Sequence, residues 1–179
     1  MKKSIIAEKR ALSPVIATVI LISVTIVVAV SVAYWMGSIA GGYTSFEQIE
    51  LPTAYAKYVD DLNTTVSGDQ PGWEIYISLK NTGSADATID NVFINSVPIV
   101  DLHDAATTGA KLYVYSGGSY SEISDYSDIN IQVTKGGSQK IKIVIFDDGS
   151  VEGASAGTRM DFKLHSAAGR DYPAQVKLP

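Results

Sequence analysis

Few side chains in this sequence could carry acid–base, nucleophilic or metal chemistry. The chain has two histidines, His103 and His165, and no cysteine. Without cysteine there are no disulfides, thiol nucleophiles or cysteine-ligated zinc or iron–sulfur clusters. His103 lies between Asp101 and Asp104, which could together ligate a metal, but the sequence favours an exposed polar loop. His165 ends a predicted strand beside a turn, where we expect a solvated edge residue.

Two acidic segments, 125–130 and 147–152, place carboxylate and hydroxyl oxygens at close spacing. Neither segment matches the calcium-binding loop of EF-hands, so Asp-rich turns are the favoured interpretation. The sequence also lacks a nucleophile elbow, a Walker loop, a dinucleotide-binding fingerprint and an H-E-x-x-H helix. We therefore expect a protein that is not an enzyme and that needs no cofactor or metal.

Charge is distributed very unevenly along the chain. The 179 residues include 14 Lys and Arg against 19 Asp and Glu, a formal net charge of −5 and a pI near 4.9. An acidic chain without a basic run argues against a nucleic-acid partner. Every charged side chain lies either in residues 1–10 or from Glu47 onward. The length allows one ordinary domain and an additional element.

The additional element is the uncharged segment 11–46, whose centre is almost wholly aliphatic. It exceeds the ~18 residues needed to identify a membrane span. We expect a helix over residues 14–40, with Pro14 in the first turn and Gly41-Gly42 after its end. Its many β-branched residues would favour a strand in water. In lipid an unclosed strand leaves backbone groups without hydrogen bonds, so we expect a helix. Tyr34-Trp35 fits an interfacial anchor.

The preceding residues 1–10 hold four basic side chains and one acidic one. This positive bias keeps the N-terminus in the cytoplasm and directs the chain after Gly42 outside. A plain signal anchor, a cleaved secretory signal and a prepilin-type leader are the alternatives. The apolar run is too long for a secretory signal, whose core spans ~7–15 residues. A basic pair, a small residue and then an apolar run distinguish the prepilin-type leader from the signal anchor.

The junction Arg10-Ala-Leu-Ser-Pro-Val-Ile-Ala-Thr-Val-Ile-Leu21 resembles the N-terminus of archaeal type IV pilins, which carry a prepilin-type (class III) signal peptide. The resemblance covers residues 1 to about 45. It implies that a membrane prepilin peptidase cuts between Ala11 and Leu12, with Arg10 at position −2. A cut after Arg10 is the near alternative. The fifth mature residue would be Ile16, where bacterial pilins carry Glu, so only the archaeal branch is resembled.

Three segments follow from this interpretation: a leader at 1–11, a transmembrane or filament-core helix at 12–42, and an extracellular β-domain at 43–179. Within the helix, small residues recur every four positions, a pattern that lets helix backbones approach closely. These residues are Ala29, Ala33, Gly37 and Gly41. A helix that is apolar on all sides must be buried in lipid or in a bundle of helices.

The C-terminal part predicts short strands joined by turns. Alternation at 73–79 indicates a half-buried strand, which a turn at 81–86 should connect to a returning strand at 87–100. We expect 141–146 to form a central strand because it would aggregate if exposed. Hairpins are predicted for three pairs of segments: 111–115 with 120–123, 130–134 with 139–146, and 159–165 with 173–178. This pattern predicts an immunoglobulin-like β-sandwich, so the fold class is α+β.

The outer domain also carries candidate surface sites. Asn63-Thr-Thr65 is the chain's N-x-[ST] sequon, so Asn63 is a candidate for N-glycosylation. Ten tyrosines stand against four phenylalanines. Four of them, Tyr113, Tyr115, Tyr120 and Tyr126, fall in or beside predicted strands. They could contact a sugar or a protein partner, and contacts between subunits are the favoured interpretation.

The sequence therefore predicts a structural subunit of an archaeal type IV pilus-like filament that serves in surface adhesion. It would be made as a membrane-anchored precursor, would polymerise with its own copies through the helix, and would reside in an extracellular filament. The resemblance implies a prepilin peptidase, an assembly ATPase and a membrane platform protein as partners. The alternatives are an archaellum subunit and a membrane-tethered module with a ligand-binding β-domain; a tethered hydrolase is more remote.

Overall fold

The computed structural model describes residues 5–62, 70–103 and 108–179. The chain divides into two compact units, Met1–Ser45 and Phe46–Pro179. The first contains one long helix, and the second contains two antiparallel sheets with the core between them. The predicted α+β class, a long N-terminal apolar helix followed by a β-sandwich, is confirmed.

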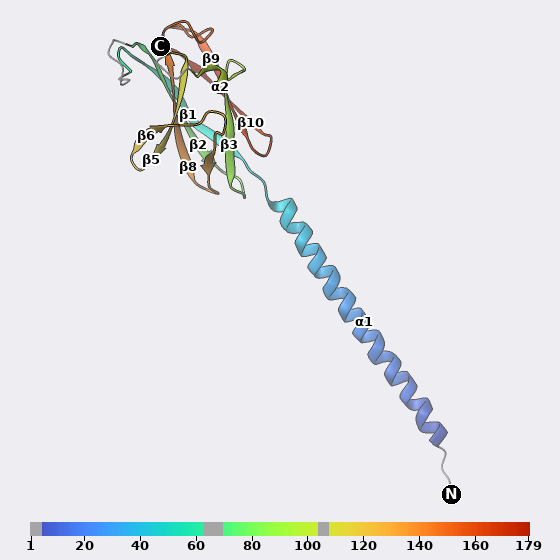
Figure 1. The fold of residues 1–179 in the computed structure, drawn as a ribbon. Helices are drawn as coiled ribbons and strands as arrows, with labels where there is room; N and C mark the ends of the chain where they lie inside the picture. The colour runs from blue at the N-terminus through green and yellow to red at the C-terminus, as the bar shows by residue number, and fades with distance from the viewer. Residues whose placement is uncertain (1–4, 63–69, 104–107) are drawn as a thin grey trace. The chain divides into compact units, whose positions relative to one another are not determined.

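Helix α1 spans Ile5–Thr44 as one continuous element (Figure 1). It begins earlier and ends later than the predicted helix over 14–40. Pro14 lies inside the helix instead of in its first turn. A proline removes one backbone donor, and a glycine lowers helix propensity by about 1 kcal/mol, so either residue weakens a long helix without having to end it. Gly41 and Gly42 accordingly lie within α1.

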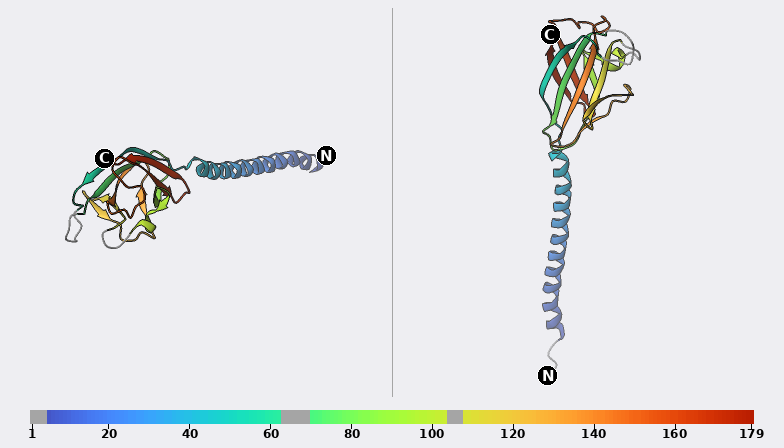
Figure 2. Two further views of the ribbon diagram at one scale, coloured as in Figure 1. Left: turned by 90° about the horizontal axis from the view of Figure 1, so that it is seen from above. Right: turned by 90° about the vertical axis from the view of Figure 1, so that its left-hand side faces the viewer.

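The first sheet has the strand order β1-β2-β8-β5-β6. Figure 2 (right) looks onto it, with cyan β1, green β2, orange β8 and yellow β5 side by side. The bounds are β1 Ile49–Val59, β2 Gly72–Asn81, β8 Ser138–Phe146, β5 Ala110–Ser116 and β6 Ser119–Glu122. Strand β8 lies at the centre of this sheet, as predicted for 141–146.

The second sheet has the order β10-β9-β3-β4, and β7 pairs with β3 off this path. Its bounds are β10 Asp171–Lys177, β9 Arg159–Ser166, β3 Ala87–Ile94, β4 Val97–Pro98 and β7 Ile131–Val133. The short helix α2, Ile99–Leu102, follows β4. It occupies part of the predicted returning strand, because the chain turns at Asn95 and Ser96, which both have positive φ.

The core forms where inward side chains of the two sheets meet. On β2, Trp73, Ile75, Ile77 and Leu79 are at most 1% exposed, which confirms the alternation read from the sequence. β8 contributes Ile141, Ile143 and Ile145, and the second sheet contributes Ile89, Ile94, Met160, Phe162 and Leu164. The side chains that alternate with them on β2 therefore point to the outer face of the first sheet.

Two of the three predicted hairpins are confirmed. β5 and β6 pair around Gly117-Gly118, whose φ values of 60° and 97° fit the primed turn that the sequence predicts. β9 and β10 pair over their whole length, from Asp171 opposite His165 to Lys177 opposite Arg159. In both cases the partner strand is adjacent in sequence and the turn residues determine the connection.

The predicted pairing of 130–134 with 139–146 is wrong. β7 pairs with β3 in the second sheet, whereas β8 pairs with β2 and β5 in the first. The chain also passes from the first sheet to the second after β2, because β3 pairs with β9 and not with β2. In a β-sandwich a short Gly-containing loop can lead to a neighbouring strand of the same sheet or to a strand of the other sheet. The local sequence does not distinguish these two connections.

Candidate functional site

The part of α1 from Pro14 to Tyr43 presents a long, exposed apolar surface. This segment has 30 residues and contains no Asp, Glu, Lys or Arg, and its most apolar 18-residue stretch has a mean hydropathy of 2.9. By length and composition it is sufficient to cross a membrane. Its side chains are exposed in the isolated chain, including Val15, Leu21 and Trp35 at 58–65%. So much exposed aliphatic surface requires lipid or other helices around it.

Ala29, Ala33, Gly37 and Gly41 lie on one side of α1. Residues four apart in an α-helix are displaced by only ~40° around the axis, so the four small residues form one continuous stripe. A Cβ atom built on Gly37 or Gly41 would meet no heavy atom within 4 Å apart from the adjoining backbone of the helix itself. The stripe is therefore open along this side of the helix, and its contact with the backbone of another helix stays a prediction.

Four hydroxyl groups of α1 form hydrogen bonds within the helix itself. Thr18, Ser23, Thr25 and Ser31 each donate to the carbonyl three or four residues earlier, at 2.7–2.9 Å. These hydroxyls therefore do not need a partner from outside the helix. Another helix that approached this segment would therefore interact with it mainly through close packing of the small residues.

The predicted processing residues Arg10, Ala11 and Leu12 lie within the backbone of α1. The structure gives no description of their side chains, so the cleavage site stays a prediction. Asn63, the candidate glycosylation site, lies outside the described residues.

A second feature lies on the outer face of the first sheet. Five tyrosines gather there, and we name this set the tyrosine face: Tyr55, Tyr76, Tyr113, Tyr115 and Tyr120. Strand register arranges them in two rows across the sheet. In one row Tyr55 pairs with Tyr76, Tyr76 with Lys142, and Lys142 with Tyr113. In the next row Thr53 pairs with Ser78 and Ser78 with Lys140, and Tyr115 pairs with Tyr120 further along.

Four rings of the tyrosine face, those of Tyr55, Tyr76, Tyr115 and Tyr120, contact one another. Tyr55 and Tyr76 are stacked, with centroids 5.2 Å apart and an interplanar angle of 18°. Tyr120 meets Tyr76 edge-on at 5.7 Å and Tyr115 at 5.1 Å. Such aromatic pairs contribute about 0.5–1.5 kcal/mol each beyond their buried area. These four rings therefore form a connected surface that is held in place before any partner binds.

Lysines pack among these rings. The Nζ atom of Lys142 lies 4.7 Å from the Tyr113 centroid and donates to Glu74 at 2.9 Å. Tyr76 also donates its hydroxyl to Glu74, at 2.7 Å. Burial raises the pKa of the Glu74 carboxyl, but the hydrogen bonds from Lys142 and Tyr76 outweigh burial, so the net shift of this pKa is downward. The Glu74 charge therefore orders the centre of the tyrosine face.

The hydroxyls of Tyr113 and Tyr76 remain protonated at neutral pH. Burial, together with the neighbouring Glu122 carboxylate, raises the pKa of Tyr113 to about 12. Burial and the hydrogen bond to Glu74 raise the pKa of Tyr76 further. Both rings thus present neutral hydroxyl groups beside their apolar faces.

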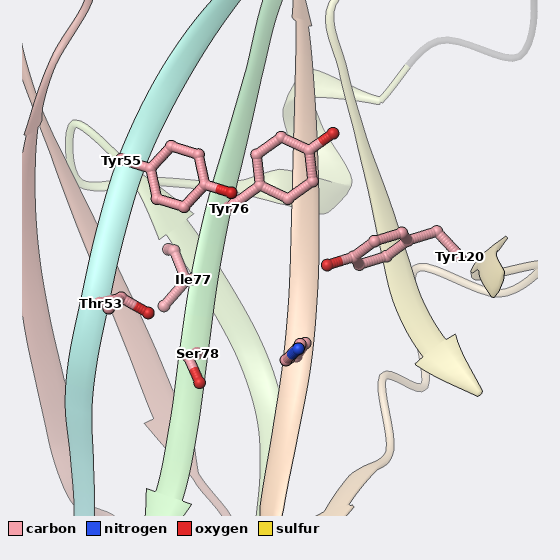
Figure 3. A pocket seen from close by; sticks show the side chains of 7 residues that line it. Thr53, Tyr55, Tyr76, Ile77, Ser78 and Tyr120 are labelled. Carbon is pink, nitrogen blue, oxygen red and sulfur yellow. The ribbon is translucent and has the colours of Figure 1, made fainter. Parts of the chain in front are cut away.

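A hollow of about 160 Å³ opens on the tyrosine face. Figure 3 shows Tyr55 and Tyr76 side by side on neighbouring strands, Tyr120 across the sheet from them, and the hydroxyls of Thr53 and Ser78 below the rings. Lys140 completes the polar side, and Ile77 also lines the hollow. The hollow therefore combines aromatic surface with hydroxyl and ammonium groups.

The other polar candidates form local structure. His103 stacks on Tyr126, with ring centroids 3.7 Å apart. His165 Nδ1 lies 2.6 Å from Asp171 on the neighbouring strand, so it has a charged partner as well as solvent. Asp125 accepts from the backbone and hydroxyl of Ser127, and Asp148 accepts from Ser150 in the same way. Within 5–62, 70–103 and 108–179 the structure shows no cluster of three metal-ligating side chains.

The sequence identified the tyrosine face only in part. Tyr113, Tyr115 and Tyr120 lie on it, but Tyr126 is 8% exposed and accepts a hydrogen bond from the backbone N–H of Leu112. Tyr55 and Tyr76 were not among the predicted residues. The period-two alternation around Trp73 places Tyr76 outside, and could have identified it.

Comparison with known proteins does not establish a family. No family model matches the chain, and no curated protein matches its sequence. Among solved structures, one chain of the archaeal flagellum of Methanospirillum hungatei is 12% identical, with 94% of this chain and 92% of that chain covered and a TM-score of 0.38. The ApaA protein of Bordetella pertussis is 10% identical, over 76% and 98%, with a TM-score of 0.35. At these identities and TM-scores the likenesses carry no functional argument.

Proposed function

We propose that this protein is the structural subunit of an archaeal type IV pilus-like extracellular filament. It polymerises with its own copies through α1, and its β-domain forms the outer surface that adheres to other surfaces. The observation that carries the proposal is the exposed, uncharged segment Pro14–Tyr43, which is long enough to lie in a membrane first and in a filament core afterwards.

The stripe of small residues supports close packing between helices in that core. Ala29, Ala33, Gly37 and Gly41 have no bulky side chain, and the space beside the two glycines is open. Segment 11–46 has no acidic residue, so no side chain of this segment can form an ion pair with the terminal amine of a neighbouring subunit. Shape complementarity along the stripe would therefore fix how far neighbouring helices are displaced along their axes.

Processing is the second part of the proposal. A prepilin peptidase removes residues 1–11, and Leu12 becomes the N-terminus of the mature helix. The leader carries Lys2, Lys3, Glu8, Lys9 and Arg10, so its removal takes away the charges that favour the cytoplasmic face. Extraction of the helix by an assembly ATPase and a membrane platform protein then meets a smaller electrostatic barrier.

Two alternatives predict different behaviour. An archaellum subunit would share the processed helix and the polymer, but its filament would rotate and drive swimming. A tethered module would keep its leader and would be monomeric in detergent. The hollow on the tyrosine face is the observation that favours the tethered module, because a binding surface does not require a filament.

The test replaces Ala29, Ala33 and Gly37 with leucine. A control variant carries Ser31→Leu, Ser38→Leu and Gly42→Leu, three small residues on the opposite side of α1. Fibres sheared from the cells are counted by electron microscopy, and membrane content of the subunit is measured by immunoblot. We expect the stripe variant to reach the membrane and form no fibres, whereas the control retains them. Normal fibres from the stripe variant would contradict the packing proposal.

A further inference from the structure

The tyrosine face combines three properties that together select a class of ligand. Its hollow has about 160 Å³, below the ~300–1,000 Å³ of pockets that enclose drug-sized ligands. The hollow is therefore large enough for one ring-sized group of a ligand. The rest of a longer ligand would extend along the open sheet. Tyr55, at 55% exposed, supplies accessible aromatic surface, and its stacking on Tyr76 fixes the orientation of both rings.

The polar groups that line the hollow can form hydrogen bonds with several hydroxyl groups of one ligand ring. Thr53 and Ser78 contribute hydroxyls that donate or accept, and Lys140 contributes an ammonium donor. Figure 3 places the hydroxyls of Thr53 and Ser78 on one side of the hollow and the tyrosine rings on the other. A pyranose ring has matching properties, with C–H groups on its faces and hydroxyls around its edge.

The charge of the face indicates an acidic sugar. Residues 46–179 carry ten Lys and Arg against eighteen Asp and Glu, yet the outer face of the first sheet carries five lysines against three glutamates. Lys142 is paired with Glu74, and Lys111 with Glu122. Lys140 has no carboxylate within salt-bridge distance among the described residues, and its Nζ lies 5.6 Å from the Tyr115 centroid. Its charge is therefore available to a ligand carboxylate.

The described part of this face is less suited to a protein partner. Exposed aliphatic side chains and arginine are missing from the hollow, and Ile77 is only 1% exposed. The cores of protein–protein interfaces favour apolar contacts and are enriched in aromatic residues, methionine and arginine. Hydroxyl and ammonium groups at the centre of a dry interface would each need a matching partner.

We propose that the tyrosine face binds a hexuronate unit of an acidic polysaccharide, with the pyranose ring on Tyr55 and Tyr76 and its carboxylate at Lys140. This inference does not depend on the filament proposal, because every residue of the hollow belongs to the β-domain. It gives adhesion a chemical target if the protein forms a filament, and gives a tethered module a ligand if it does not.

The experiment titrates the full chain in detergent with a galacturonic acid trisaccharide by isothermal calorimetry, and with the corresponding neutral galactose trisaccharide. We expect the acidic sugar to bind more tightly. Tyr55→Leu, which keeps an apolar side chain but removes the ring, should weaken binding by about tenfold. Lys140→Gln should remove most of the preference for the acidic sugar.

Matched controls separate binding from folding. Tyr58→Leu removes an aromatic ring from the same strand outside the hollow, and Lys80→Gln removes a positive charge outside the hollow. Both controls should bind like the unmodified chain. Absence of binding at about 10 mM sugar, equal binding of both sugars, or unchanged binding in Tyr55→Leu would overturn the proposal. So would self-association that Tyr55→Leu abolishes without any sugar binding, since the face would then be a subunit contact.

Discussion

The carboxylate of Glu47 accepts a hydrogen bond from the buried hydroxyl of Ser166, although 119 residues separate them in sequence. Glu47 is itself 7% exposed, and Tyr172 donates to the same carboxylate at 3.3 Å. The adjacent Phe46 carbonyl accepts from the backbone N–H groups of Ser84 and Ala85. Hydrogen bonds therefore hold the first residues of the β-domain to the second sheet and to the turn between β2 and β3.

The contact between Glu47 and Ser166 should contribute measurably to stability. We predict a coupling energy of about 1.5–3 kcal/mol between Glu47→Ala and Ser166→Ala, because a hydrogen bond to a charged group is stronger than a neutral one. A double-mutant cycle by urea unfolding in detergent measures it. Additivity within about 0.5 kcal/mol would contradict a direct interaction.

Asn81 should be a strong determinant of stability. Its fully buried side chain donates to the carbonyls of Ala85 and Val133 and accepts from the N–H of Gly83. We predict that Asn81→Ala lowers the free energy of unfolding by about 3 kcal/mol, because several buried backbone groups lose their partner. Chemical denaturation provides the measurement.

Thr82→Ala is the control for Asn81→Ala. Thr82 lies in the same turn, and its hydroxyl donates to Glu50 at 3.3 Å in an exposed position. Its loss should change stability by less than about 1 kcal/mol. Equal effects from the two variants would show that the Asn81 hydrogen bonds are unimportant.

Glu74 should make the stability of the β-domain depend on pH in the acid range. Hydrogen bonds from Lys142 and Tyr76 outweigh burial and hold its folded pKa below the ordinary value of 4.5. The unfolded chain therefore binds the proton at a higher pH than the folded chain does. The stabilisation is complete above the unfolded pKa and is lost as the pH falls through the folded value.

We therefore predict that Glu74→Gln destabilises the chain more at neutral pH than in acid, and flattens the stability profile between about pH 5 and pH 3. Unfolding midpoints measured across this range give the profile. Glu50→Gln, which removes a carboxylate from the exposed edge strand β1, is the matched control. A profile with the same slope in Glu74→Gln and the unmodified chain would refute the role of this pair.

Local patterns were sufficient to predict some elements and not others. The alternation of Trp73, Ile75, Ile77 and Leu79 marks β2, and Gly117-Gly118 marks the turn between β5 and β6, because each depends on neighbouring residues. The partner of β7 depends on which sheet the chain enters, which no local pattern determines. The missed pairing of Glu47 with Ser166 is also a long-range consequence of the fold.

The same distinction applies to the candidate sites. The four-residue spacing from Ala29 to Gly41 already places these small residues on one side of a helix, so the sequence predicts the stripe without the structure. The tyrosine face requires strand order and register. Tyr55 and Tyr120 lie 65 positions apart in sequence and line one hollow only because β1, β2, β8, β5 and β6 are neighbours in that order.

The N-terminal peptide of surface material distinguishes a processed filament subunit from a membrane-tethered module. Fibres sheared from cells are collected by centrifugation, digested and analysed by mass spectrometry. The account predicts a mature N-terminus at Leu12, or at Ala11 if the cut follows Arg10, in material that sediments as fibres. An intact Met1 leader confined to the membrane fraction would contradict a processed filament subunit and favour the tethered module.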